Sequence, residues 1–185
     1  MEWTIPGTIL SAPVDTVDQM QEKMNAMFMG GGIVLSQVAA ITGLEPYTIQ
    51  NWVKRGFLTK PINKKYTLRQ LCRILNINML KDALPMEEIC GLMTYINGHM
   101  DDESDDLIDD SQLYFLFLHI AASHRQMQDP AGRDQYIQSA LEHYEEPIPG
   151  AKKRVENVLK VMLTAWAAAL LRQQATAMAA QLKND

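Results

Sequence analysis

The spacing of apolar residues along the chain predicts an all-α protein. Hydrophobic side chains recur at three- and four-residue intervals, which places them on one face of a helix. Glycine- and proline-containing breaks separate these segments. We expect helices over approximately 15–29, 35–44, 46–55, 67–79, 84–98, 111–127, 129–144 and 151–182. One short basic segment could form a small β-hairpin, and no longer strand-like alternation occurs.

The breaks divide the chain into four parts. Residues 1–32 are expected to form an extended arm and a helix capped by Asp15, which the three glycines from Gly30 to Gly32 end. A compact helical head follows over 33–99. Residues 100–110 form an acidic linker, with seven acids in the ten residues from Asp101 to Asp110. A helical tail spans 111–185.

Residues 35–58 predict two short helices joined by a tight turn, the arrangement by which many proteins present a helix to the DNA major groove. Val38, Ile49 and Trp52 would point inward. Gly43 would supply a turn residue with positive φ, and Pro46 suits the first turn of the second helix. The head therefore has the pattern of a helix-turn-helix.

The charge is distributed very unevenly. The whole chain carries −5, but the segment from Ile33 to Leu84 holds eight Lys/Arg against two acids. Its net charge of +6 leaves −11 for the remainder. Cations concentrated beside a helix-turn-helix favour contact with phosphates, whereas the alternative is a solvated face without a ligand.

The head resembles the MerR family of winged helix-turn-helix regulators. The family pattern Thr-hydrophobe-Arg-Tyr-aromatic-x-x-x-Gly-hydrophobe-Leu is similar to the segment from Thr48 to Leu58, and the basic wing is matched by the segment from Lys64 to Thr67. The family's hydrophobe-x-x-Glu-Glu-Ile helix start is similar to the segment from Leu84 to Ile89. The likeness covers about 60 of the 185 residues. In layout the chain also resembles an uncharacterised bacterial family that joins such a head to a helical tail.

This resemblance implies a winged helix-turn-helix head that binds double-stranded DNA. Gln50 and Asn51 replace an arginine and a tyrosine of the family pattern, so its sequence preference does not carry over. Both side chains can still pair with adenine, while lysines and arginines would contact phosphates. The candidate DNA-contacting residues are Tyr47, Thr48, Gln50, Asn51, Lys54, Arg55, Lys60, Lys64, Lys65 and Tyr66.

The acidic run allows two interpretations. It lacks the glycine and glutamate positions of a calcium-binding EF-hand loop. It is either a solvated linker or an acidic strap on the basic face, which would make the protein autoinhibited. The apolar and aromatic tail is interpreted as core, as a homodimer interface or as a pocket for a small-molecule effector.

The sequence offers no support for catalysis. His119 and His124 lie five residues apart, which does not suit two ligands on one helical face, and no phosphate-binding glycine loop or nucleophile motif occurs. We expect no metal, no cofactor and no enzymatic activity. Cys72 and Cys90 are expected to be reduced and buried, and no apolar run is long enough for a membrane span. The sequence thus predicts a cytoplasmic, DNA-binding transcriptional regulator that forms a homodimer; the alternative is a protein-interaction module on the same scaffold.

Overall fold

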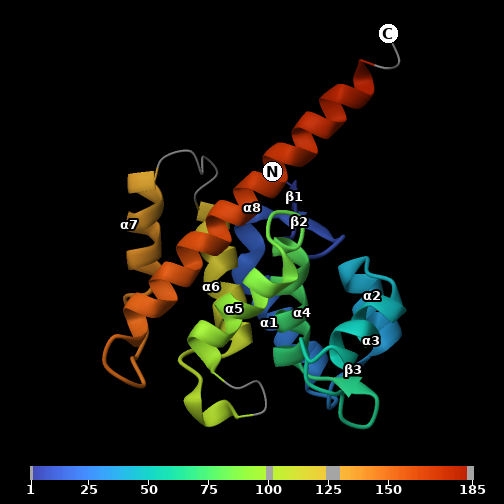
Figure 1. Ribbon diagram of the computed structural model, residues 1–185, viewed down its shortest axis with the longest axis vertical. Helices are drawn as coiled ribbons and strands as arrows, with labels where there is room; N and C mark the ends of the chain where they lie inside the picture. Colours follow the sequence, from blue (N-terminus) through green and yellow to red (C-terminus); the bar gives the residue numbers. More distant parts are fainter. Residues whose placement is uncertain (1, 99–101, 124–129, 183–185) are drawn as a thin grey trace.

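The computed structural model describes residues 2–98, 102–123 and 130–182. This part of the chain is mainly α-helical, as the sequence predicts (Figure 1). Its helices are α1 (Val17–Phe28), α2 (Leu35–Thr42), α3 (Pro46–Lys54), α4 (Leu68–Leu80), α5 (Met86–Asn97), α6 (Asp110–Ser123), α7 (Pro130–Ala140) and α8 (Ala151–Gln181). Strand β1 (Glu2–Thr4) pairs with β2 (Ser11–Pro13), and β3 (Ile33–Val34) pairs with β4 (Lys65–Tyr66), both antiparallel. Two short 3-10 helices are η1 (Val14–Thr16) and η2 (Glu103–Asp105).

The N-terminal segment is a hairpin, where an extended arm was expected. Trp3 pairs with Ala12 across β1 and β2, and the Trp3 ring meets Trp166 of α8 edge-on with centroids 6.3 Å apart. The helix that follows begins at Val17, one residue after the start that a cap at Asp15 predicts, because η1 precedes it. Thr16, and not Asp15, occupies the cap position.

The first two helices predicted for the head are present as α2 and α3. Gly43 ends α2 with φ +70°, in the left-handed region where glycine has no steric penalty. Pro46 begins α3, where its missing N–H removes no helical hydrogen bond. Val38 and Ile49 are fully buried at the contact between the two helices and the core, as their spacing predicts.

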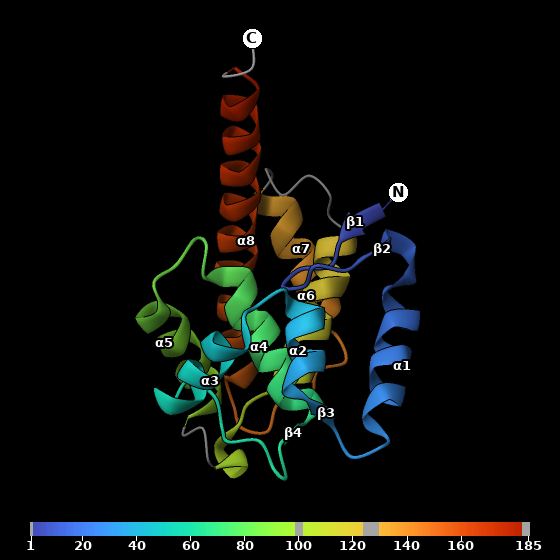
Figure 2. The ribbon, with the colours of Figure 1, turned by 90° about the vertical axis from the view of Figure 1, so that its right-hand side faces the viewer.

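Helix α4 is the central helix of the molecule. Its sequence predicts an apolar stripe on one face, but every residue from Leu71 to Ile77 is buried, including Arg73 and Asn76. The reason is that α1, α2, α5, α6 and α8 all pack against it (Figure 2). Its N-terminus has the predicted capping box: the Gln70 amide N–H donates to Thr67 Oγ1 at 3.2 Å, and the Thr67 amide N–H donates to Gln70 Oε1 at 2.9 Å.

Only the first part of the acidic segment is solvated as expected: Asp102, Ser104 and Asp105 are exposed, whereas residues 106–110 lie against the core. Leu107, Ile108 and Asp110 are each at most 5% exposed. Asp110 accepts a hydrogen bond from Arg73 Nη1 at 3.2 Å, and Asp106 pairs with Arg69. Leu107 and Ile108 are part of the apolar core, and their burial holds this segment against the body of the molecule. The acids therefore neutralise arginines that the sequence assigned to the basic head.

Burial dominates the titration of these carboxyl groups. The Asp110 pKa is raised by desolvation, although the Arg73 and Arg69 charges beside it act in the opposite direction. The Asp106 pKa is likewise raised by burial against the opposing hydrogen bond from Arg69. The acid-arginine cluster thus fixes the segment 106–110 against α4 at a desolvation cost to both charges.

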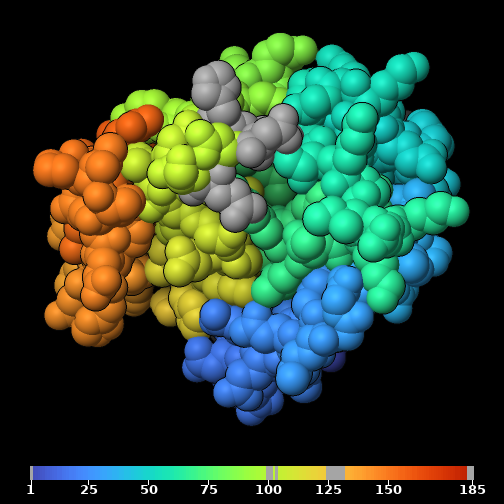
Figure 3. Space-filling model, turned by 90° about the horizontal axis from the view of Figure 1, so that it is seen from below, coloured from blue at the N-terminus to red at the C-terminus, as the bar shows by residue number. Residues whose placement is uncertain are grey.

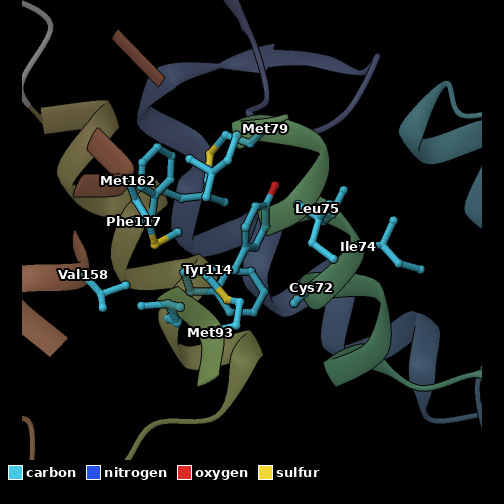
Figure 4. Packing of buried hydrophobic residues seen from close by; sticks show 14 of the residues in the cluster. Cys72, Ile74, Leu75, Met79, Met93, Tyr114, Phe117, Val158 and Met162 are labelled. Carbon is cyan, nitrogen blue, oxygen red and sulfur yellow. The ribbon is translucent and has the colours of Figure 1, made fainter. Parts of the chain in front are cut away.

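The tail helices complete the core. Tyr114 and Phe117 of α6 are fully buried among residues of α4, α5 and α8, and the Tyr114 hydroxyl donates to the Pro6 carbonyl at 2.8 Å (Figure 4). His99, His124 and Asp129, and the predicted end of this helix at Met127, lie outside the described residues. α7 ends at Ala140, short of the predicted Tyr144, whereas α8 closely matches its predicted range.

The C-terminal part of α8 projects from the body of the molecule (Figures 1 and 2). All residues from Leu170 to Leu182 are exposed, including Leu171 and Met178. The buried residues, by contrast, form one apolar cluster that runs from Ile5 to Ala165 and crosses the acidic segment. Cys72 lies inside this cluster, Cys90 is half-buried, and neither forms a disulfide. Among the described helices, none has both the length and the apolar character needed to cross a membrane.

Candidate nucleic-acid interface

Helix α3 presents a polar outer face while its inner face is anchored in the core. Ile49 and Trp52 are at most 6% exposed and fix the rotation of the helix. The predicted contact residues on the opposite side are largely accessible. Tyr47, Gln50, Asn51, Lys54 and Arg55 are exposed, and Thr48 is half-buried. The helical period thus separates the anchoring residues from the candidate contact residues.

The predicted hairpin is also formed; we call residues 60–66 the basic hairpin. Its tip is a two-residue turn in which Ile62 and Lys65 exchange both backbone hydrogen bonds, at 3.1 and 2.9 Å. The central residues Asn63 and Lys64 both have positive φ, +51° and +63°. This is the pattern of a type I′ turn, whose twist matches that of paired strands. Lys64 therefore stands exposed at the tip in a conformation that lysine rarely adopts.

Three contacts hold the base of the basic hairpin. β4 pairs with β3, which places Tyr66 opposite Ile33. Gln70 donates from Nε2 to the Thr59 hydroxyl at 2.8 Å and to the Lys60 carbonyl at 3.1 Å. At Gly32, with φ +102°, a Cβ would lie 2.6 Å from the Tyr66 carbonyl oxygen, so that position requires glycine. The end of the hairpin that joins the body is thereby fixed.

A groove lies between α3 and the basic hairpin. It has a volume of about 540 Å³. Gln50 lines it from α3, Lys64 and Pro61 line it from the hairpin, and Val34 and Ser36 line it at the start of α2. A predicted base-contacting side chain and a predicted phosphate-contacting cation therefore face one shared space.

Five cations surround this face, but they differ in how free they are. Lys54, Lys60 and Lys64 are exposed and make no side-chain hydrogen bond or ion pair with any described residue. Lys65 donates to the Gly30 carbonyl at 3.3 Å. Arg55 stacks over the Phe57 ring at 4.6 Å and lies 3.9 Å from the exposed Glu87 carboxylate.

Two further arginines do not belong to this face. Arg69 and Arg73 are paired with the acidic segment, so they contribute little to its positive charge. Lys81 lies at the opposite end of α4. The face is consequently less basic than the count from Ile33 to Leu84 suggests, although the cations on α3 and the hairpin remain.

Tyr66 is the most deeply buried of the ten candidates, although it lines the inner wall of the groove. Its side chain is 3% exposed and belongs to the apolar core, and burial raises the pKa of its hydroxyl. The alternation of a β-strand explains this: the exposed Lys65 and the buried Tyr66 point to opposite sides of the hairpin.

Two residues of the candidate interface were not predicted from the sequence. Asn63 sets the hairpin turn, and the signal for it was available, since asparagine tolerates positive φ better than most residues. Ser36 lines the groove from the first turn of α2, and no local pattern distinguishes it from any other exposed serine.

Comparison with known proteins adds a family but no activity. The chain is 25% identical over 118 residues to the "Uncharacterized protein YkrK" of Bacillus subtilis (strain 168), an alignment that covers 62% of this chain and 51% of that protein. The chain thus spans about half the length of this relative. No solved structure matches this chain. A family model described as "Domain of unknown function (DUF1836)" matches residues 16–117, which include helices α1 to α5, the basic hairpin, the acidic segment and part of α6. Because the match spans more than half of the chain, the protein belongs to the DUF1836 family.

Proposed function

We propose that this protein is a DNA-binding transcriptional regulator whose head is a MerR-like winged helix-turn-helix. The observation that carries the proposal is the shared groove. Gln50 on α3 and Lys64 on the basic hairpin line it together, and Lys54 and Lys60 lie on the same two elements. A polar helix flanked by cations on a hairpin suits a duplex, whose bases are read between two phosphate strands.

In this proposal α3 enters the major groove. Gln50 and Asn51 are exposed and carry carboxamides, which can pair bidentately with adenine. Lys54 follows on the same exposed side of α3, and Lys60 and Lys64 on the hairpin would contact phosphates. The resemblance of the segments from Thr48 to Leu58 and from Lys64 to Thr67 to MerR proteins supports the same roles.

We further propose a homodimer formed through the projecting part of α8. Leu171, Met178 and Leu182 are exposed there at spacings of seven and four residues, which places them along one side of the helix. A second copy packed on this stripe would cover it. Two heads would then supply the cations for two half-sites, because a single head has few.

Charge substitution tests the proposal directly. A Lys54/Lys60/Lys64→Ala variant removes three exposed cations that stabilise no described contact, so it should fold normally and lose at least about 100-fold in affinity for duplex DNA at low salt. Lys81→Ala is the matched control. Lys81 lies about 20 Å along α4 from the hairpin end, so its loss should change affinity by less than about threefold. Equal affinity of the triple variant and wild type would refute the proposal.

One observation favours a different function, a protein-interaction module on the same scaffold. Tyr47 on α3 and Ile62 on the hairpin are 71% and 70% exposed, and large side chains of this kind are the ones that protein partners cover. Ile62→Ser, which leaves the candidate DNA contact Tyr47 in place, separates the two functions. A protein partner would be lost with its apolar contacts, whereas DNA affinity, which depends mainly on the lysines, would change little.

A further inference from the structure

The end of α8 has a regular series of exposed side chains that the body of the molecule does not cover. These positions recur at intervals of three, four, three and four residues; we call them the α8 seam, and they are Ala168, Leu171, Ala175, Met178 and Leu182. Leu171, Met178 and Leu182 are 57%, 66% and 76% exposed. Alternating intervals of three and four residues are the heptad pattern by which one helix packs along another. The α8 seam therefore has the pattern of a helix-pairing surface.

The α8 seam lies on the side of α8 that faces away from the molecule. Met162, Ala165 and Ala169 are buried, and at 3.6 residues for each turn they point in the direction opposite to the seam. The same spacing continues back to Thr164, but Arg133 of α7 donates to its hydroxyl at 2.7 Å, so the open seam begins at Ala168. Figure 2 shows this end of α8 extending beyond the other elements. The seam is thus open to a second helix along its length.

The charges along this part of α8 favour a second copy of the same helix. Between Ala168 and Leu182 the sequence has one charged residue, Arg172. Its guanidinium lies 3.1 Å from the Asp82 carboxylate, which compensates its charge. Paired helices that select a different partner do so through charges that flank the seam. The other flanking residues here are uncharged (Gln174, Ala179 and Gln181), so two identical helices meet without uncompensated like charges.

The alternation of small and large side chains sets the direction of the second helix. Ala168 and Ala175 occupy one heptad position of the seam, and Leu171 and Met178 occupy the other. In a parallel pair the same positions meet, so layers of two alanines, which leave a gap, would alternate with layers of two large side chains. In an antiparallel pair each alanine meets a large side chain, and the layers have similar volumes. The seam therefore packs more evenly in the antiparallel direction.

We propose that a second copy of this chain packs antiparallel along the α8 seam. Ala168 lies opposite Met178 of the second copy, and Leu171 lies opposite Ala175 of the second copy. Both pairs place the two-fold axis level with residue 173. This inference rests on the homodimer of the proposed function and adds its direction and register. The seam is only about 21 Å long, so we expect a dimer that dissociates on dilution.

This arrangement leaves the candidate nucleic-acid interface uncovered. Figure 3 views the molecule from the end opposite to the projecting part of α8, and the blue-green and green surface of the head lies at that end. Figure 2 likewise shows the connection into β4 and the end of α8 at opposite ends of the molecule. Pairing through the α8 seam therefore leaves the basic hairpin of both copies accessible to DNA.

Disulfide mapping of the full chain tests the direction of the second helix. Cys90→Ala is the background, since Cys90 is half-buried whereas Cys72 is buried. A mixture of Ala168→Cys and Met178→Cys chains should form a covalent dimer under mild oxidation, because the two residues face each other. Each variant alone should not, since the two copies of residue 178 would lie about 15 Å apart, beyond the roughly 7 Å that a disulfide spans between Cα atoms.

A mixture of Gln173→Cys and Met178→Cys chains gives the background of random collisions, because residue 173 points away from the seam. Covalent dimers from either seam variant alone would show a parallel pair and overturn the proposal. A mixture of the two seam variants that forms no more covalent dimer than this control would overturn it as well.

Met178→Ala separates a role in pairing from a role in folding. Met178 is largely exposed in the single chain, so helix content should not change. The dissociation constant of the dimer, measured by sedimentation, should rise at least about 10-fold, because a large side chain is lost from two layers. Gln173→Ala is the control on the other side of α8 and should change the constant by less than about twofold. An unchanged constant for Met178→Ala would refute the seam.

The outcomes also separate this inference from the proposed function. A dimer that forms with the wrong disulfide pairs overturns the direction and register but leaves the homodimer. A chain that stays monomeric at every concentration overturns the seam and the homodimer together. DNA binding by the head is tested independently by the Lys54/Lys60/Lys64→Ala variant.

Discussion

The turn at the tip of the basic hairpin makes a quantitative prediction about Lys64. This residue has φ +63°, where a side chain costs about 1–2 kcal/mol relative to the right-handed region. Glycine avoids that cost but loses about 0.5–1 kcal/mol through the greater freedom of the unfolded chain. Lys64→Gly also creates Asn-Gly, the preferred pair of a type I′ turn. We expect Lys64→Gly to be more stable than Lys64→Ala by about 1 kcal/mol.

Lys64→Ala is the matched reference because it removes the same charge and keeps the conformational cost. Urea unfolding of the two variants should give equal m-values and a higher midpoint for Lys64→Gly. The melting temperatures should differ by about 2–4 °C for a chain of this size. Both variants should bind duplex DNA equally weakly, since both lack the cation. If Lys64→Gly is no more stable than Lys64→Ala, the left-handed conformation assigned to Lys64 is wrong.

Three further predictions concern other parts of the fold. Gly32→Ala should lower the free energy of unfolding, measured with urea, by at least about 1–2 kcal/mol. Gly30→Ala is the control, because a Cβ there meets nothing within 4 Å, and it should be neutral or slightly stabilising. Equal effects of the two substitutions would contradict the close approach at Gly32. Asp110 has a pKa raised by burial and held down in part by Arg73, so Arg73→Met should raise it further in a carboxyl NMR titration, and a lower value would refute the pairing. Its raised pKa also means that this group favours folding at low pH and that its contribution is lost as the pH rises from 3.8 through the folded value. Leu171→Glu places a charge on the exposed stripe of α8, so the proposed homodimer should dissociate to monomers in analytical ultracentrifugation. A persistent dimer would exclude this interface.

Local patterns were sufficient to predict most helices and the chemistry at their ends. Gly43, Pro46 and the Thr67–Gln70 box all occur at helix ends as expected, because a cap depends on residues close in sequence. The rotation of α3 was also predictable, since Ile49 and Trp52 follow the helical period.

The pairing of charges was not predictable in the same way. Arg73 and Asp110 are 37 residues apart, and nothing near Arg73 in sequence indicates that it is buried. An apolar stripe on α4 predicts one covered face, but five helices surround it. The prediction that Arg73 belongs to a basic surface was therefore wrong, because tertiary contacts that a local pattern does not reveal bury this residue. The prediction of a solvated linker failed for residues 106–110 for the same reason. Leu107 and Ile108 are buried in the core, so the acids beside them lie against α4.

The candidate site was predictable in composition but not in geometry. The exposed positions Gln50, Asn51 and Lys54 follow from the period of α3. The burial of Tyr66 depends on the pairing of β4 with β3, a contact over more than 30 residues.

The salt dependence of DNA binding tests the central claim most directly. The exposed cations Lys54, Lys60, Lys64 and Lys65 allow about four phosphate contacts in each head, so log K should fall against log salt with a slope of roughly −4 for one head and −7 for a dimer. The DNA is a duplex selected by the purified protein from a pool of random sequences. Its affinity, measured by fluorescence anisotropy between 50 and 200 mM salt, should therefore fall by roughly 100-fold to 10⁴-fold. Undetectable binding at the lowest salt, or a slope near zero, would contradict the account.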